Sequence, residues 1–96
     1  MLVVVSYDVS TLSSKGRKRL RRIAKHCLDY GQRVQNSVFE CNVDPTQWEI
    51  FKNKLLNEMN KKEDSLRFYY LGKNWNNRVE HIGIKPSIDM EGLLVI

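Results

Sequence analysis

The chain begins with an apolar run that ends in a carboxylate. Residues 2–8 read Leu-Val-Val-Val-Ser-Tyr-Asp, and a valine-rich run of this length is typical of a strand buried on both faces. An unpaired charge is too costly to bury, so the carboxylate of Asp8 must be hydrated, capped or bound to a metal ion. Asp8 is therefore the first candidate site residue in the chain.

The next hydrophobic pattern predicts a helix. A polar turn covers residues 10–16, and either Ser13 or Ser14 is placed as the N-cap. We expect the helix to end near Tyr30, with Gly31 as its C-cap. Its apolar stripe recurs at spacings of three and four residues and comprises Leu20, Ile23, Ala24, Cys27 and Leu28.

The middle of the chain alternates in the manner of a strand and then changes to a helical period. Residues 32–43 predict two short strands that meet near residues 36–37. Asp44, Pro45 and Gln47 predict a helix start, because they supply a capping aspartate, a proline at the first helical position and a glutamine three residues after the cap. The apolar face of this second helix comprises Trp48, Phe51, Leu55 and Met59.

The last third of the chain predicts strands only. Residues 66–71, 79–84 and 92–96 are the expected extended segments. The order is β-α-β-β-α-β with a C-terminal strand, which is the ferredoxin-like α+β pattern in a single domain, residues 1–96. If exposed, the apolar residues 92–96 would form an aggregation-prone edge. Pairing with the sheet of a second copy removes that edge, so we expect a two-fold homodimer.

Positive charge is concentrated in the first predicted helix. The net charge is +5 over 96 residues, and residues 15–25 carry seven positive charges and no negative one. Like charges at this spacing destabilise a helix, which favours an anionic partner such as nucleic acid. A membrane partner is disfavoured because this helix offers no large aromatic side chain for insertion. The candidate nucleic-acid contacts are Arg17, Lys18, Arg19, Arg21, Arg22 and Lys25.

The cysteines and the N-terminus indicate a cytoplasmic protein. Cys27 and Cys41 lie on different predicted elements without a Cys-x-x-Cys spacing, so we expect buried free thiols in a reducing compartment. The apolar residues 2–5 have no basic flank before them and are too few to span a bilayer. We therefore expect no signal peptide.

Four further acids are interpreted as surface residues, and two histidines are not placed in the active site. Asp64 lies in the polar turn of residues 61–65 and is interpreted as a surface turn residue. No residue of this group is expected to be a second metal ligand or a general base. The group comprises His26, Asp44, Glu58, Glu63, Asp64 and His81.

Three segments of the chain form a specific combination. They are Val-Val-Ser-Tyr-Asp-Val at residues 4–9, Asp-Tyr-Gly at residues 29–31 after the basic helix, and Arg-Val-Gln-Asn-Ser-Val-Phe-Glu at residues 33–40. In this combination the chain resembles the Cas-two family, the smaller of the two core CRISPR adaptation proteins. The Tyr-Asp strand end occurs in many domains, whereas the third segment at this distance from it is specific, and the likeness extends over nearly the whole chain.

The resemblance implies a ferredoxin-like homodimer that assembles with the CRISPR integrase and holds duplex DNA for insertion as a new spacer. It also implies a metal-dependent phosphodiesterase activity, on RNA in some members and on double-stranded DNA in others. Asp8 matches the metal ligand of the family. Positions that surround this site or affect activity are matched by Tyr7, Arg33, Ser37 and Phe39, and more loosely by Arg17 and Arg19.

These observations combine into one functional expectation. Magnesium needs only one or two protein carboxylates, and a symmetric dimer brings two Asp8 side chains to one ion. We therefore expect a Mg²⁺-dependent endonuclease, with Mn²⁺ as an alternative ion, that prefers double-stranded DNA to RNA. Asp8 is the expected ligand, Ser37 and Arg33 are further catalytic candidates, and Arg33 is also a nucleic-acid contact. Tyr7 and Phe39 are interpreted as packing residues.

Three alternatives are compatible with the same residues. In the first, Asp8 only caps the following turn through the backbone amides of Ser10 or Thr11. In the second, the protein is a non-catalytic adaptor that bridges integrase dimers on DNA by charge alone. In the third, it is a metal-dependent endoribonuclease of the toxin type on the same fold.

Overall fold

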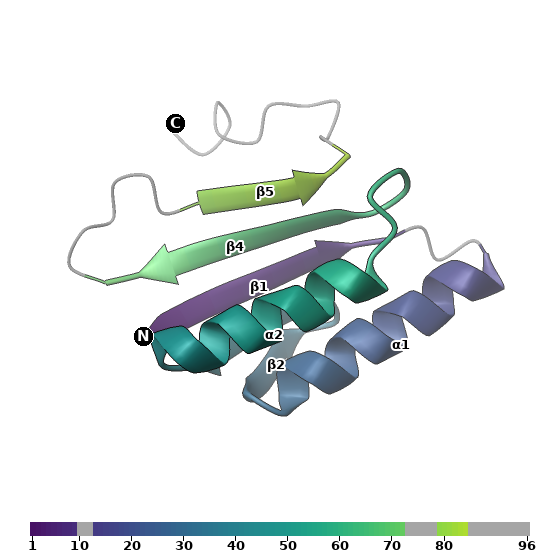
Figure 1. The fold of residues 1–96 in the computed structure, drawn as a ribbon. Helices are drawn as coiled ribbons and strands as arrows, with labels where there is room; N and C mark the ends of the chain where they lie inside the picture. The colour runs from purple at the N-terminus through teal and green to yellow at the C-terminus, as the bar shows by residue number, and fades with distance from the viewer. Residues whose placement is uncertain (10–12, 73–78, 85–96) are drawn as a thin grey trace, which may run out of the picture.

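The computed structural model describes residues 1–9, 13–72 and 79–84 of the chain. It contains one antiparallel sheet and two helices (Figure 1). The elements are β1 (Leu2–Asp8), α1 (Ser14–Leu28), β2 (Gly31–Gln35), β3 (Val38–Asn42), α2 (Pro45–Glu58), β4 (Ser65–Leu71) and β5 (Val79–Gly83).

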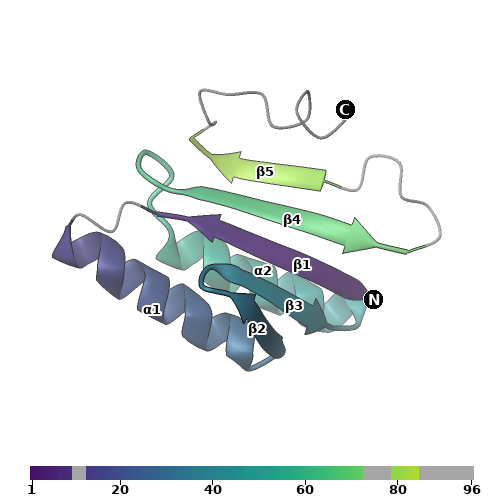
Figure 2. The same cartoon turned by 180° about the vertical axis from the view of Figure 1, so that it is seen from behind.

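The first strand lies at the centre of the sheet. The strand order is β2-β3-β1-β4-β5, and β1 pairs antiparallel with both β3 and β4. Both helices cover one face of the sheet, and the opposite face, seen in Figure 2, carries no helix among the described residues. This arrangement confirms the predicted ferredoxin-like α+β fold, with β5 added at the edge beside β4.

One face of β1 is buried, which corrects the prediction that both faces are. Val3, Val5 and Tyr7 are fully buried under the helices. The alternating residues Leu2 and Asp8 are exposed, because no described helix or strand covers the second face of the sheet (Figure 2). We call this uncovered side the open face.

The starts of both helices follow the predicted capping chemistry. The hydroxyl of Ser13 accepts a hydrogen bond from the Gly16 amide at 3.0 Å. Asp44 accepts one from the Gln47 amide at 2.7 Å, and the Gln47 side chain accepts one from the Asp44 amide at 3.0 Å, which completes a capping box.

The end of α1 differs from the prediction. Asp29 caps the helix in a right-handed conformation, and Gly31 is the first residue of β2 instead of the helix cap. A Cβ atom at Gly31 would lie 1.9 Å from the carbonyl oxygen of Glu40. Glycine is therefore needed here because β2 and β3 approach closely, and not because the helix end requires a left-handed residue.

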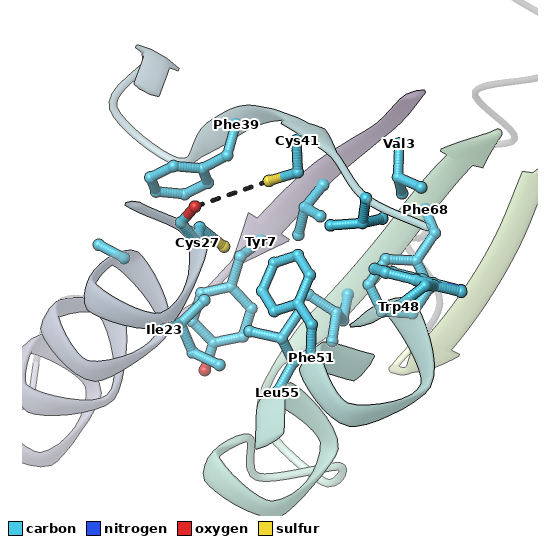
Figure 3. Close-up of a cluster of buried hydrophobic side chains, with 14 of the residues drawn as sticks. Val3, Tyr7, Ile23, Cys27, Phe39, Cys41, Trp48, Phe51, Leu55 and Phe68 are labelled. Atoms are coloured by element: carbon cyan, nitrogen blue, oxygen red, sulfur yellow. Dashed lines mark hydrogen bonds between the residues drawn. The ribbon is translucent and has the colours of Figure 1, made fainter. Parts of the chain in front are cut away.

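The hydrophobic core lies between the two helices and the face of the sheet that they cover (Figure 3). The ring of Trp48 packs edge-on against Phe68 at 4.9 Å and against Phe51 at 5.4 Å. Cys27 and Cys41 are buried free thiols, as predicted. Burial of Tyr7 and Phe39 confirms their interpretation as packing residues.

Two predicted features fall outside the described residues. They are the cap of Asp8 by Ser10 or Thr11 and the C-terminal strand over residues 92–96. Of the helices that the structure describes, neither has the length and apolar character that a membrane crossing requires.

Candidate metal and nucleic-acid site

Asp8 lies on the open face at the C-terminal end of the central strand. Successive side chains of a strand point to opposite faces, so the burial of Tyr7 places Asp8 on the uncovered side. Its cross-strand neighbour on β4 is Ser65. Asp8 is therefore a solvent-accessible carboxylate carried by a strand that is hydrogen-bonded on both sides.

The Asp8 carboxylate is free of ion pairs and hydrogen bonds within the described part of the chain. No group of three or more potential ligands lies together in residues 1–9, 13–72 and 79–84. Among these residues, the donor set at the end of β1 is thus a single exposed carboxylate. Such a set fits Mg²⁺, which retains several waters, when a second subunit contributes the second carboxylate.

A buried carboxylate, that of Asp64, directly precedes the cross-strand neighbour of Asp8 and contacts Tyr7 on the helix side of the sheet. Asp64 is fully buried, which corrects its interpretation as a surface turn residue. Its Oδ2 accepts hydrogen bonds from the Tyr7 hydroxyl and from the Asn60 amide at 2.9 Å. The Arg19 guanidinium donates to both carboxylate oxygens, with Nε–Oδ2 at 2.9 Å and Nη2–Oδ1 at 3.1 Å.

The protonation states in this cluster follow from its geometry. Burial and the hydrogen bond to Asp64 raise the pKa of Tyr7, so the phenol keeps its proton and donates it. The hydrogen bond to Asp64 also raises the pKa of Arg19, which stays charged. The cluster ties β1, α1 and the start of β4 together around the residue that precedes Asp8.

Arg19 has a structural role that its place in the basic segment did not predict. Its side chain is only 12% exposed and forms ion pairs with Asp64 and Glu63. The residues around Asp64 do not indicate that it is buried. A signal did exist in Tyr7, whose hydroxyl is bonded to Asp64. A buried tyrosine hydroxyl needs a hydrogen-bond partner, and Tyr7 was predicted to be a packing residue.

Ser37 lies close to the end of β1, whereas Arg33 lies on the other side of the sheet. The Ser37 carbonyl accepts a hydrogen bond from the Tyr7 amide at 2.9 Å, which places the β2–β3 turn beside Asp8. The Arg33 guanidinium lies over the ring of the buried Phe39, 5.2 Å from its centre. Arg33 is therefore on the helix side, and the structure does not bring it to Asp8 of the same subunit.

The basic helix presents its charges outward. Glu58 of α2 lies 4.0 Å from Arg22 and 3.4 Å from the His26 Nε2 atom, so part of this charge is compensated. Arg19 is the member of the basic segment that turns inward. The exposed members are Lys15, Arg17, Lys18, Arg21, Arg22 and Lys25.

Comparison with known proteins identifies a family whose members resemble this chain. A family model described as "CRISPR associated protein Cas2" matches residues 1–79. A protein of Nitratidesulfovibrio vulgaris named "CRISPR-associated endoribonuclease Cas2" is 64% identical over 96 residues, which is 100% of this chain and 94% of that protein. A protein of the same name from Chlorobaculum tepidum is 65% identical and is covered over 100% of both chains.

Two further relatives extend the comparison. A Halalkalibacterium halodurans protein named "CRISPR-associated endonuclease Cas2" is 57% identical over 95 residues, covering 99% of each chain. The crystal structure of Streptococcus pyogenes Cas2 at pH 6.5 matches with a TM-score of 0.73 and 58% identity, over 86% of this chain and 100% of that one.

Proposed function

The chain belongs to the Cas2 family of CRISPR-associated proteins, and from this premise we propose that it is a Mg²⁺-dependent endonuclease of CRISPR adaptation. It acts as a cytoplasmic homodimer on double-stranded DNA and assembles with the CRISPR integrase. The observation that carries the proposal is Asp8, an exposed carboxylate with no partner among the described residues, held at the end of the most enclosed strand of the sheet.

The dimer follows from the donor set and from the open face. At the end of β1, the described residues of one subunit offer one exposed carboxylate, and a two-fold axis there supplies the second. The open face and its edge also expose apolar side chains, since Leu2, Leu71 and Val79 are 37%, 51% and 44% exposed. Covering such side chains with a second copy is favourable because it removes apolar surface from water.

The basic helix supplies the binding surface for nucleic acid. Its exposed arginines and lysines neutralise phosphate charge without reading base sequence. This is the property expected of a protein that holds any DNA fragment destined to become a spacer. Arg33, exposed at the sheet edge over Phe39, extends this surface. We assign it to nucleic-acid contact in preference to catalysis at its own subunit's Asp8.

The chemistry required of the site is hydrolysis of a phosphodiester. When bound, Mg²⁺ neutralises phosphate charge and activates a water molecule. Asp8 would hold the ion, and the cluster of Tyr7, Asp64 and Arg19 fixes the strand end that carries Asp8. Ser37 lies beside that strand end, where its hydroxyl orients a phosphate or a water.

Cleavage by an Asp8→Asn variant tests the proposal. We expect the wild type to cut plasmid DNA with Mg²⁺ and not with a chelator, and Asp8→Asn to lose at least about 100-fold in rate while duplex binding is retained. Asp29→Asn is the matched control, because it makes the same chemical change at the exposed cap of α1. Equal rates for wild type and Asp8→Asn would instead support the non-catalytic adaptor.

The second candidate function is cleavage of RNA, because two of the relatives are named endoribonucleases. The relatives at 64% and 65% identity are named endoribonucleases, whereas the relative at 57% is named an endonuclease. The same experiment with a single-stranded RNA substrate separates the two functions. Faster cutting of RNA than of duplex DNA, lost in Asp8→Asn, would replace our substrate assignment and retain the metal site.

A further inference from the structure

The surroundings of Asp8 on the open face follow from the strand register. Ser65 lies directly opposite Asp8, and Arg67 lies directly opposite Ser6, the preceding open-face residue of β1. Directly opposed residues of antiparallel strands project to the same face. Arg67 is therefore the diagonal neighbour of Asp8 on the open face.

The burial of β4 agrees with this placement. Leu66 and Phe68 are fully buried on the helix side, whereas the alternating residues Ser65 and Arg67 are half-buried. Diagonal neighbours are separated by about 7–8 Å, a distance that a long side chain spans. The Arg67 guanidinium can thus reach a phosphate that is held at Asp8.

No acid neutralises Arg67 within the part of the chain that the structure describes. No described carboxylate lies within ion-pair distance of it. Glu80, the acid of β5, lies opposite the buried Phe68 on the helix side, where it contacts Lys52 at 2.6 Å and the Tyr70 hydroxyl at 2.9 Å. Among the paired positions of the described strands, Arg67 is also the only lysine or arginine on the open face.

We infer that Arg67 is a phosphate-binding residue of the Asp8 site, which contacts the non-bridging oxygens of the phosphodiester that is cut. This inference rests on the proposed nuclease function. A planar guanidinium matches two phosphate oxygens at once, and the charge on those oxygens must be stabilised as the bond to the leaving oxygen breaks. The basic helix α1 covers the opposite face of the sheet from Arg67 (Figure 1). We assign α1 to general contacts with the bound duplex, and Arg67 to the phosphate that reacts.

Three variants test the inference. Arg67→Gln removes the charge, Arg67→Lys keeps it without the planar fork, and Lys54→Gln makes the same charge change on the exposed side of α2. For duplex DNA with Mg²⁺, we expect Arg67→Gln to lower kcat by about 100-fold with a smaller change in KM. Arg67→Lys should recover part of the loss, and Lys54→Gln should match the wild type.

A binding measurement provides a readout that does not depend on turnover. In an Asp8→Asn background with chelator, affinity for a short duplex is measured against salt concentration. Adding Arg67→Gln should reduce the slope of log affinity against log salt by about 1, the value for one lost phosphate contact. Adding Lys54→Gln should leave this slope unchanged.

Two outcomes would overturn the inference. One is a wild-type kcat and salt slope in Arg67→Gln. The other is dissociation of the Arg67→Gln dimer in sedimentation, which would make Arg67 a subunit-interface residue. If the wild type itself fails to cleave with Mg²⁺ or Mn²⁺, the proposed nuclease function fails, and the salt slope still decides whether Arg67 contacts phosphate.

Discussion

Asp64 connects three elements through one carboxylate group. It receives the Tyr7 hydroxyl from β1, the Arg19 guanidinium from α1 and the Asn60 amide from the turn before β4. A buried carboxylate is tolerable only when its charge and lone pairs are satisfied, and all its partners here are donors. The residue therefore holds the end of β1 and the basic helix in a fixed relation.

Replacement of Asp64 should be strongly destabilising. Asp64→Ala leaves the Arg19 charge and the Tyr7 hydroxyl without their shared partner, and we expect the free energy of unfolding to fall by about 3–5 kcal/mol. Urea denaturation measures this change. Glu63→Ala removes the other ion pair of Arg19, whose acidic side chain is 56% exposed, and should cost less than about 1 kcal/mol. Similar losses in the two variants would contradict the structural role of Asp64.

At this scale, the predictable residues were those whose environment is set by strand alternation. The phase of β1 placed Tyr7 in the core, and the position of Asp8 at the strand end marked it as a site residue. Asp64 was misjudged because a polar residue between Lys-Lys-Glu and a strand has the local pattern of a surface turn. Its burial depends on Arg19, 45 residues away, and this contact has no signature in either local segment.

The hairpin of β2 and β3 depends on a close backbone approach at its start. Gly31 faces the Glu40 carbonyl so closely that no side chain fits. We expect Gly31→Ala to destabilise the protein by about 1–3 kcal/mol, the usual cost of forced overpacking, as measured by thermal or urea unfolding. Gly72→Ala is the matched control, because a Cβ there meets no atom of the described residues within 4 Å. Equal stability of the two variants would show that β2 shifts without cost.

The edge strand β5 is held to the helix layer by a polar link. Glu80 accepts the Tyr70 hydroxyl and pairs with Lys52 of α2. The hydrogen bond from Lys52 lowers the pKa of Glu80, while burial and the bond to Glu80 raise the pKa of Tyr70 to about 12. The tyrosine thus remains a donor at neutral pH, and Glu80 remains an acceptor.

The stability that Glu80 contributes should depend on pH in a defined direction. Its folded pKa lies below the ordinary value of 4.5, so its contribution is present above that pH and is lost as the pH falls through the lowered value. We expect the free energy of unfolding of Glu80→Gln to be lower than that of the wild type at pH 7 and to converge with it in acid. Glu49→Gln, on the exposed side of α2, should show no such convergence.

Element types were predictable because most segments here have one dominant period. Both capping predictions were confirmed, since Ser13 and Asp44 act through neighbours within three residues. The predicted C-cap at Gly31 was wrong. A glycine after a helix can either cap the helix or allow a close approach of two strands, and here the pairing of β2 with β3 requires it. The burial of β1 was overestimated for the single chain. A valine run shows that a strand is apolar on both faces, but it does not show whether the second face is covered by the same chain or by another subunit.

For the whole molecule, the proposed site is a property of the pair of subunits. If each site needs both Asp8 carboxylates, one defective subunit should inactivate the dimer. Wild type and Asp8→Asn, mixed in equal amounts and refolded together, should retain roughly one quarter of the wild-type rate under random pairing. A rate near one half would show that each subunit works alone. Mixing with Asp29→Asn controls for losses on refolding.

The central position of β1 has a consequence for how the site can move. Backbone amides paired on both sides are usually among the last to open in hydrogen exchange. The strand β1 is paired with β3 from Leu2 to Ser6 and with β4 from Leu2 to Asp8. Asp8 is thus the last paired residue of a central strand, where its position is fixed by the pairing with Ser65 of β4. In the proposed dimer, the distance between the two Asp8 carboxylates then changes when one subunit rotates or slides against the other. The contact between the subunits therefore sets the geometry of the metal site.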